Sequence, residues 1–350
     1  MSVRVDCAAL GAFCSALLRA QGLAPAHADE VMRCLLHADL WGVDSHGVSR
    51  LPIYLERLRR GAVNPRPVLA TRSGAAAVAT IDGDNGPGAV VGGHAMRDAL
   101  ARAALHGVGV AVARRSNHYG VAGHYARMAV PAGCIGVSGT NAPITMAAWG
   151  AREPALGTNP FAVALPAGRF GTFALDMSSS VVAKGRILQA RRRGTPIPEG
   201  WALDAAGRAT TDAAAAWDGV VLPFAGPKGS GFALFVEALS GALAGAAMAG
   251  AIADQYTVFD RPAGVGHFFI ALQIEAFMPL AEFTARMETL VSEIQGRRRA
   301  DGVDRIRMPG ALEAESEARL RADGIPLDAA LADQLDALAR DAGLATLPRR

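Results

Sequence analysis

The alternation of strand-like and helix-like segments between residues 77 and 193 is the feature that most constrains the fold of this chain. Short apolar runs that indicate strands occupy 77–81, 108–113, 135–138, 161–165 and 173–175. Helical patterns lie between and after them, at 89–106, 121–132 and 180–193. Strands and helices that alternate at this spacing are typical of an α/β core. We therefore expect an α/β domain over residues 73–279, with one more strand at 267–274.

Both ends of the chain carry helical patterns instead. Apolar residues recur with helical spacing over 10–18 and 31–38, and a third helix is indicated over 50–60. The segment after residue 280 is also mostly helical in character. The most economical arrangement is a discontinuous helical domain, made of residues 1–72 and 280–350, around the central α/β domain.

The charge balance argues against a nucleic-acid partner. The chain has 35 Lys and Arg residues against 32 Asp and Glu residues, which gives a formal net charge of +3. No face dense in Lys and Arg is interleaved with aromatic residues, so the electrostatic attraction for nucleic acid is weak.

The segment 229–253 has a single charged residue, Glu237, and could be mistaken for a membrane span. Most of it is Ala and Gly, so insertion would gain little, while Glu237 would cost roughly 2.5–3.5 kcal/mol at the bilayer centre. We expect a buried helix that packs closely on a neighbour, and no membrane partner.

The cysteines and histidines show no metal-binding spacing. The four cysteines form no C-x-x-C pair, and no two histidines form H-x-x-x-H. We expect free thiols in a reducing compartment and no catalytic metal. Charged residues within the first thirty positions interrupt any signal-peptide core, which favours a cytoplasmic location.

The first residues able to carry chemistry lie between two predicted helices, in the segment 44–50 (DSHGVSR). A histidine with its ordinary pKa of about 6.5 can donate or accept a proton at neutral pH, and an arginine offers a planar fork that fits a carboxylate. His46 and Arg50 together would suit a 2-oxo or 2-hydroxy acid. In the alternative interpretation Asp44 and Ser45 only cap a helix, and His46 is an ordinary loop residue. A hydrolase triad is disfavoured, because adjacent residues cannot easily converge and no G-x-S-x-G surrounds Ser45.

Two further segments combine glycines with a predicted helix start, where exposed backbone N–H groups can bind an anion. The segment 116–125 (SNHYGVAGHY) follows the strand at 108–113, and the segment 226–231 (GPKGSG) begins the Ala- and Gly-rich helix. Neither has the P-loop spacing, and the dinucleotide fingerprint G-x-G-x-x-G is absent. A bound dinucleotide would therefore not be held by the standard Rossmann turn. An ordinary polar turn is the alternative for 116–125.

Five motifs, in this order, resemble the malate/L-lactate dehydrogenase family of NAD(P)-dependent oxidoreductases. They lie at 42–47 (GVDSHG), 116–120 (SNHYG), 157–160 (GTNP), 197–204 (IPEGWALD) and 228–231 (KGSG). The family includes malate, sulfolactate and ureidoglycolate dehydrogenases as well as cyclic-imine carboxylate reductases. The resemblance implies a mixed-sheet α/β fold distinct from the Rossmann fold, with a discontinuous helical domain. It also implies a homodimer whose active site lies near the subunit interface.

The resemblance assigns roles residue by residue. His46 matches the proton donor, with Ser45 beside it and Arg50 on the substrate carboxylate, while some members have the proton acceptor at the position of His118. Substrate contacts are implied for Thr158, Lys184 and Gly185. Cofactor contacts are implied for His118, Tyr119, Gly120, Val121, Ala122, Asp176, Met177, Ser178, Lys228 and Gly229.

The implied activity is reversible hydride transfer between NAD or NADP and a small 2-oxo or 2-hydroxy acid. A cyclic-imine carboxylate reductase and a non-catalytic member of the fold are the alternatives. The imine-reductase branch carries an aspartate where this chain has Arg186, which disfavours that alternative. The chain also departs from the family pattern at 178–180 (SSS) and at Ala311, which stands where a glutamate is expected.

Overall fold

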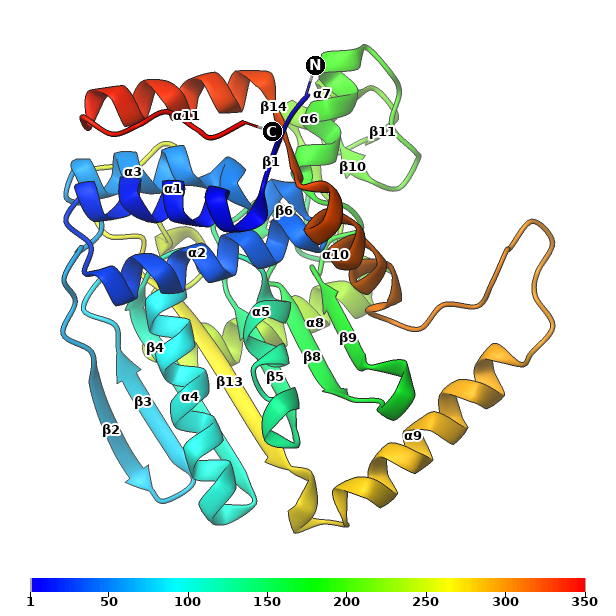
Figure 1. The fold of residues 1–350 in the computed structure, drawn as a ribbon. Helices are drawn as coiled ribbons and strands as arrows, with labels where there is room; N and C mark the ends of the chain where they lie inside the picture. The colour runs from blue at the N-terminus through cyan, green and yellow to red at the C-terminus, as the bar shows by residue number, and fades with distance from the viewer. Residues whose placement is uncertain (1, 350) are drawn as a thin grey trace.

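The computed structural model describes residues 2–349 and contains a seven-stranded mixed sheet at its centre (Figure 1). The order of its strands is β2 (Ala70–Ala75), β3 (Val78–Asp82), β4 (Val108–Ser116), β13 (Val265–Gln273), β5 (Cys134–Thr140), β8 (Phe161–Pro166) and β9 (Thr172–Met177). Strands β3 and β4 pair in parallel, and the other neighbours pair antiparallel. The mixed sheet confirms the predicted α/β class, and its strands do not have the Rossmann arrangement.

Helices α4 (Gly88–His106) and α5 (Ala122–Arg127) cover one face of this sheet (Figure 1). Glycines in the strands allow the helices to approach. A Cβ on Gly109 of β4 would lie 1.9 Å from the carbonyl oxygen of Ala99, and one on Gly136 of β5 would lie 2.2 Å from that of Ala126. Any side chain there would push the helix away from the sheet, so both positions require glycine.

The opposite face carries α8 (Pro227–Glu237) and the π-helix η5 (Ala238–Leu243), which pack on Val112 and Phe268. The expected helix over the Ala- and Gly-rich segment is therefore correct in place but ends at Leu243 rather than near residue 253. The expectation that it is buried is wrong in part, because Leu234 is 53% and Phe235 is 50% exposed. Within residues 2–349, no helix is both long enough and apolar enough to cross a membrane.

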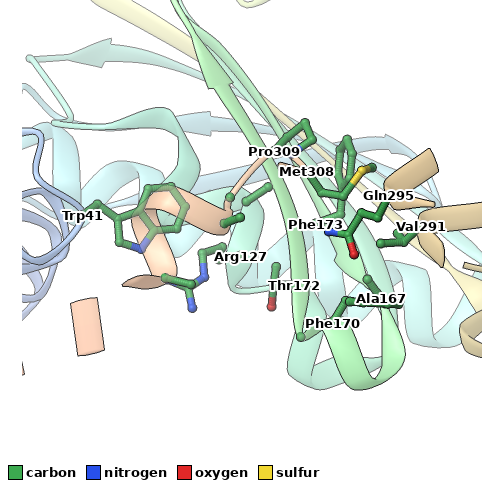
Figure 2. A pocket seen from close by; sticks show the side chains of 15 residues that line it. Trp41, Arg127, Ala167, Phe170, Thr172, Phe173, Val291, Gln295, Met308 and Pro309 are labelled. Carbon is green, nitrogen blue, oxygen red and sulfur yellow. The ribbon is translucent and has the colours of Figure 1, made fainter. Parts of the chain in front are cut away.

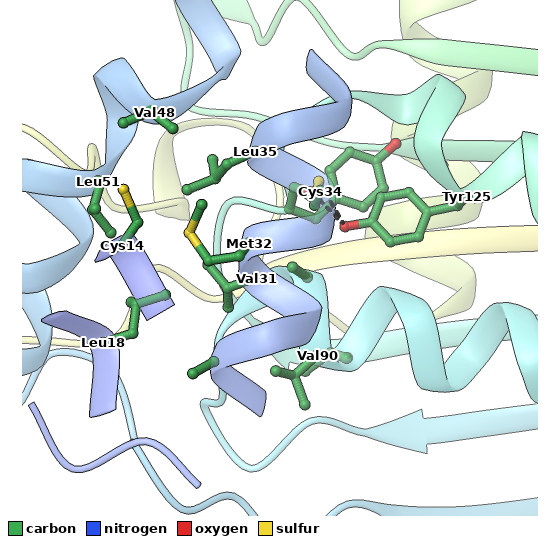
Figure 3. Packing of buried hydrophobic residues seen from close by; sticks show 14 of the residues in the cluster. Cys14, Leu18, Val31, Met32, Cys34, Leu35, Val48, Leu51, Val90 and Tyr125 are labelled. Atoms are coloured by element: carbon green, nitrogen blue, oxygen red, sulfur yellow. Dashed lines mark hydrogen bonds between the residues drawn. The ribbon is translucent and has the colours of Figure 1, made fainter. Parts of the chain in front are cut away.

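The N-terminal helices pack on α4 and share one continuous core with the inner face of the sheet. They are α1 (Cys7–Ala20), α2 (Pro25–Leu40) and α3 (Leu51–Arg59). Figure 3 shows α2 in the middle of this core, with Leu18 and Cys14 of α1 on one side and Tyr125 of α5 on the other. The thiol of Cys34 lies 3.7 Å from the Tyr125 hydroxyl. This packing fixes the end of α2 relative to the sheet.

The two ends of the chain meet in a short antiparallel pair, where β1 (Ser2–Val5) lies beside β14 (Ile325–Asp328). Helices α10 (Ala311–Asp323) and α11 (Ala329–Asp341) flank β14. Helix α9 (Leu280–Gln295) extends away from the body of the molecule (Figure 1) and contacts the β8–β9 hairpin through the ion pair of Arg169 with Glu288. The division into domains at residues 72 and 280 stays a prediction.

A second, five-stranded sheet forms a separate lobe with α6 (Lys184–Arg193) and α7 (Ala213–Asp218), which enclose their own small core. Its strands follow the order β11 (Ala209–Thr210), β10 (Ala202–Leu203), β12 (Val220–Val221), β6 (Met146–Ala147) and β7 (Pro154–Leu156). The sequence predicts only a loop-rich region at 194–228, since strands of two residues have no detectable period. The predicted helix at 180–193 starts later, at Lys184. The one predicted at 121–132 divides into α5 and a 3-10 turn over Val130–Ala132.

Candidate active site

A tight bend follows α2 and presents the side chains of the first motif. It consists of two 3-10 turns, η1 (Asp44–His46) and η2 (Val48–Arg50). The buried carboxylate of Asp39 accepts a hydrogen bond from the backbone N–H of Val48 at 2.8 Å, and a Cβ on Gly47 would lie 1.8 Å from its Oδ1. Asp39 therefore ties the bend to the end of α2, and only glycine fits at position 47. The sequence analysis gives Asp39 no role.

Ser45, His46 and Arg50 form a connected group within the bend. The Ser45 hydroxyl lies 3.0 Å from His46 Nδ1, and Arg50 Nε donates to the carbonyl oxygen of Ser45 at 2.5 Å. The Arg50 guanidinium lies 5.3 Å from the centre of the Tyr256 ring. Among residues 2–349, no carboxylate forms an ion pair with Arg50. Its positive charge is left for a ligand.

His118 reaches the same group from the end of β4. Its ring stacks on that of His46 with 5.6 Å between centroids and an angle of 29°. The Tyr54 hydroxyl lies 2.6 Å from His118 Nδ1. The structure thus brings together Ser45, His46, Arg50 and His118, as the resemblance implies. It adds Tyr54, which the sequence analysis missed because its partner is 64 residues away.

The surroundings of both imidazoles favour their neutral form. Removal from solvent, and then the nearby Arg50 cation, lower the pKa of His46 to about 4. Burial also holds the pKa of His118 well below its usual value, with Arg50, His46 and His267 as further causes. A bound carboxylate would offset the charge of Arg50 and raise the pKa of both groups.

Several of the expected cofactor residues form a second cluster at the ends of β4 and β9. The backbone N–H of Gly123 donates to Asp176 Oδ2 at 2.7 Å, which joins the turn at 118–122 to the end of β9. The N–H of Ser179 donates to the carbonyl oxygen of Thr158 at 2.7 Å. A Cβ on Gly229 would lie 2.9 Å from the carbonyl oxygen of Ser179. The segments around residues 120, 158, 177 and 229 are therefore neighbours.

The expected cofactor residues differ in what they can offer. The Tyr119 side chain is buried and stacks on His267 at 4.6 Å, and Val121 and Ala122 are buried too, so this turn presents backbone rather than side chains. Met177 ends β9, opposite Phe161. Lys228 is exposed in the first turn of α8. An exposed lysine at a helix N-terminus is suited to an anionic group.

Lys184 and Gly185 begin α6. The Lys184 ammonium lies 5.0 Å from the centre of the Trp217 ring. Burial lowers the pKa of Lys184, and the negative charge of Asp254 opposes this shift. The loop that starts at Asp254 also contains Tyr256, on which Arg50 stacks. Gly185 is exposed with open space around it.

A cavity of about 290 Å³ lies beside the second cluster (Figure 2). Trp41 and Arg127 line one side, and Phe173, Met308 and Pro309 line the other. The N–H of Ala174 donates to the carbonyl oxygen of Pro309, so the segment 308–311 runs alongside β9. The indole N–H of Trp41 is buried without a partner in the described part of the chain. The cavity thus has flat apolar walls and one cation, Arg127, which stacks on Trp41 and pairs with Glu317 at 3.2 Å.

Within residues 2–349, no group of three or more His, Cys, Asp and Glu side chains is placed to hold a metal ion.

The model of the malate/L-lactate dehydrogenase family matches residues 5–336. The chain belongs to the malate/L-lactate dehydrogenase family. It is 40% identical over 88% of its length to L-sulfolactate dehydrogenase of Methanocaldococcus jannaschii, covering 88% of that protein. It is 38% identical over 89% of its length to malate dehydrogenase of Pyrococcus abyssi, covering 87% of it.

Solved structures of the family have the same fold. The sulfolactate dehydrogenase of Methanocaldococcus jannaschii superposes with a TM-score of 0.93 at 37% identity, over 98% of both chains. Δ1-piperideine-2-carboxylate reductase of Pseudomonas syringae is more distant, with a TM-score of 0.86 at 27% identity over 96% of this chain and 99% of that one. The resemblance drawn from the five motifs is therefore confirmed at the level of the family.

Proposed function

We propose that the chain transfers hydride reversibly between a nicotinamide dinucleotide and C2 of a small 2-oxo or 2-hydroxy acid. The observation that carries this proposal is an arginine without a carboxylate partner, Arg50, placed beside the stacked imidazoles of His46 and His118. The curated relatives support it, since their names describe dehydrogenases of malate and sulfolactate.

The polar residues Arg50, His46 and His118 each have a definite task in this proposal. Arg50 binds the substrate carboxylate through two parallel N–H bonds, which fixes the carbon skeleton. His46 donates a proton to the oxygen at C2 during reduction and accepts it during oxidation. His118 lies close enough to His46 to be the proton donor in its place. The rates of His46→Ala and His118→Ala decide between the two.

The residues beside the cavity fit a dinucleotide. The walls of Trp41 and Phe173 suit a planar ring, and Arg127, which pairs with Glu317, lies at its edge. Lys228, exposed in the first turn of α8, suits an anionic group. Of the expected cofactor residues, Asp176 is linked to one wall of this cavity, since it accepts a hydrogen bond from the N–H of Gly123, where a Cβ would lie 2.8 Å from the Trp41 ring. The bound cofactor, NAD or NADP, supplies the hydride chemistry, and the protein holds it in place.

We also propose a homodimer, because one face of the main sheet is apolar and only partly covered. Val110, Ile270, Val137, Val163 and Leu175 are opposite one another across five adjacent strands, on the face away from α4, and each is only partly buried. Antiparallel sheets that face water usually alternate apolar and polar residues. An apolar row of this width favours a protein partner, and a second copy of the chain is the partner that the family implies. The free cysteines are in keeping with a cytoplasmic location.

The test is a panel of 2-oxo acids and cyclic-imine carboxylates, each assayed with NADH and with NADPH by nicotinamide absorbance. Pyruvate, oxaloacetate and sulfopyruvate should be reduced faster than piperideine-2-carboxylate, because Arg186 stands where the imine reductases have an aspartate. Faster turnover of the imine would favour the cyclic-imine reductase. Binding of either cofactor without turnover of any acid would favour a non-catalytic member of the fold.

A further inference from the structure

Tyr54 of α3 lies against His118, whose ring stacks on that of His46. Tyr54 lies four residues after Arg50, the last residue of the 3-10 turn η2 that precedes α3. The Tyr54 hydroxyl lies 2.6 Å from His118 Nδ1, with 6.0 Å between the ring centroids. The hydrogen bond is short, and it holds the phenol beside the Nδ1 atom of the imidazole.

Two observations show which atom donates. The backbone N–H of Gly120 also points at His118 Nδ1, at 3.4 Å, and a backbone amide can only donate. His118 Nδ1 must then carry a lone pair. In addition, the Tyr54 hydroxyl has no other hydrogen-bond partner within residues 2–349, so its hydrogen would be left without an acceptor if the imidazole donated to it.

The proton of a neutral imidazole with an unprotonated Nδ1 resides on Nε2. No residue of the described chain accepts a hydrogen bond from His118 Nε2, and His118 is only partly buried, so this atom is open to a ligand. The ring of His46 stacks on one face of the His118 ring.

We propose that Tyr54 is a positioning residue. It holds His118 as the Nε2–H tautomer, so that Nε2 can donate a hydrogen bond to a ligand. The use of that donor toward a substrate oxygen rests on the function proposed above. A donor aimed at the oxygen of C2 stabilises the negative charge that develops there during hydride transfer. Tyr54 acts only through His118 in this proposal.

The surroundings of His118 support a neutral ring. Burial lowers its pKa, and the charged or titratable groups that face it are Arg50 and His46 from the bend, Tyr54 from α3 and His267 from β13. A phenol that donates to Nδ1 stabilises the neutral ring further, so loss of the hydroxyl should raise the pKa of His118.

The experiment is a long-range ¹H–¹⁵N spectrum of the full chain without ligands, with His118 assigned from a His118→Gln variant. The proposal predicts an unprotonated, hydrogen-bonded Nδ1 and a protonated Nε2 at pH 7. In Tyr54→Phe the Nδ1 resonance should move to the position of a weaker hydrogen bond, and the pKa of His118 should rise. A protonated Nδ1 in the wild-type chain, or a His118 spectrum and pKa unchanged in Tyr54→Phe, would overturn the proposal.

Kinetics supply the second readout. In Tyr54→Phe, kcat for reduction of the preferred 2-oxo acid should fall about tenfold, the size of one hydrogen bond, while the Kd of the reduced cofactor stays within twofold. Leu55→Val, a buried change on the same helix, is the control for general loss of packing and should leave the His118 resonances in place. Equal effects of both variants on His118 and kcat would contradict a specific role for Tyr54. The spectrum needs no substrate, so its outcome is separate from the result of the acid panel.

Discussion

At the scale of single residues, His46 and His118 are the two candidates for the proton donor. A positioned acid contributes about 10²- to 10⁴-fold to a rate. His46→Ala should therefore lower kcat by that factor and leave the Kd of the cofactor nearly unchanged, measured by nicotinamide fluorescence. Near-full activity of His46→Ala together with loss of activity in His118→Ala would transfer the role to His118.

Asp39 links the bend to a pH dependence of folding. Burial raises the pKa of this carboxyl from 3.8 to about 7, so the folded chain holds a proton that the unfolded chain releases above pH 4. The free energy of unfolding should then fall as pH rises from about 4 to 7. Asn at this position has no proton to lose and can still accept the hydrogen bond from Val48.

Urea denaturation of the wild-type chain and of Asp39→Asn at pH 5 and pH 7.5 measures this effect. We expect the stability of the wild-type chain relative to the variant to decrease by roughly 1 to 3 kcal/mol between these pH values, at about 1.4 kcal/mol for each pH unit within the window. The same pH dependence in both proteins would contradict a buried, protonated Asp39.

The sequence predicts most residues of the candidate site but not the contacts between them. His46, Arg50 and His118 stand out because they occur in motifs with a chemical use. Asp39 and Tyr54 do not, since their roles depend on Val48, Gly47 and His118, which only the folded bend brings within reach.

At the scale of elements, the bend between α2 and α3 is the part that positions the chemistry. A Cβ at residue 47 would overlap Asp39 Oδ1, so Gly47→Ala must move either the carboxylate or the bend. We expect a loss of roughly 1 to 3 kcal/mol of stability, typical of overpacking, and a larger proportional loss of kcat. Gly74→Ala, at a position with open space, is the matched control and should change neither quantity. Thermal unfolding and initial rates provide the comparison, and a Gly47→Ala variant as active and stable as the control would refute this account of the bend.

Long helices and strands whose apolar residues recur with a clear period are predicted well, and short ones are not. Helix α4 and strands β4, β5 and β8 lie within a few residues of their expected positions, because each buries a periodic set of apolar side chains. The two-residue strands of the lobe and the outward course of α9 are missed. Their positions depend on partners that are distant in the sequence.

At the scale of the whole molecule, the apolar outer face of the main sheet is the interface that we propose for a homodimer. Ile270 lies at the centre of the row between Val110 and Val137, so a lysine there would place a charge in the proposed interface. Ile270→Lys should change the mass in solution from twice 36.1 kDa to 36.1 kDa, measured by light scattering after size exclusion. Leu105→Lys, on an exposed residue at the end of α4, should keep the mass of the wild-type chain. A wild-type chain that is already a monomer would contradict the homodimer.

The family and the mixed α/β fold could be predicted from five short motifs and the alternation of elements. The position of the proposed interface could not, because a strand that is apolar on both faces gives the same pattern whether a helix or a second subunit covers it.

The most direct test is the initial rate of NADH or NADPH oxidation as a function of the concentration of the preferred 2-oxo acid, for the wild-type chain and for Arg50→Lys. The lysine keeps the charge but loses the planar fork. We predict turnover by the wild-type chain and a KM for the acid at least tenfold higher in Arg50→Lys, with the Kd of the cofactor unchanged. An unchanged KM in the variant, or no oxidation of either cofactor by the wild-type chain with any 2-oxo acid, would contradict the proposed site.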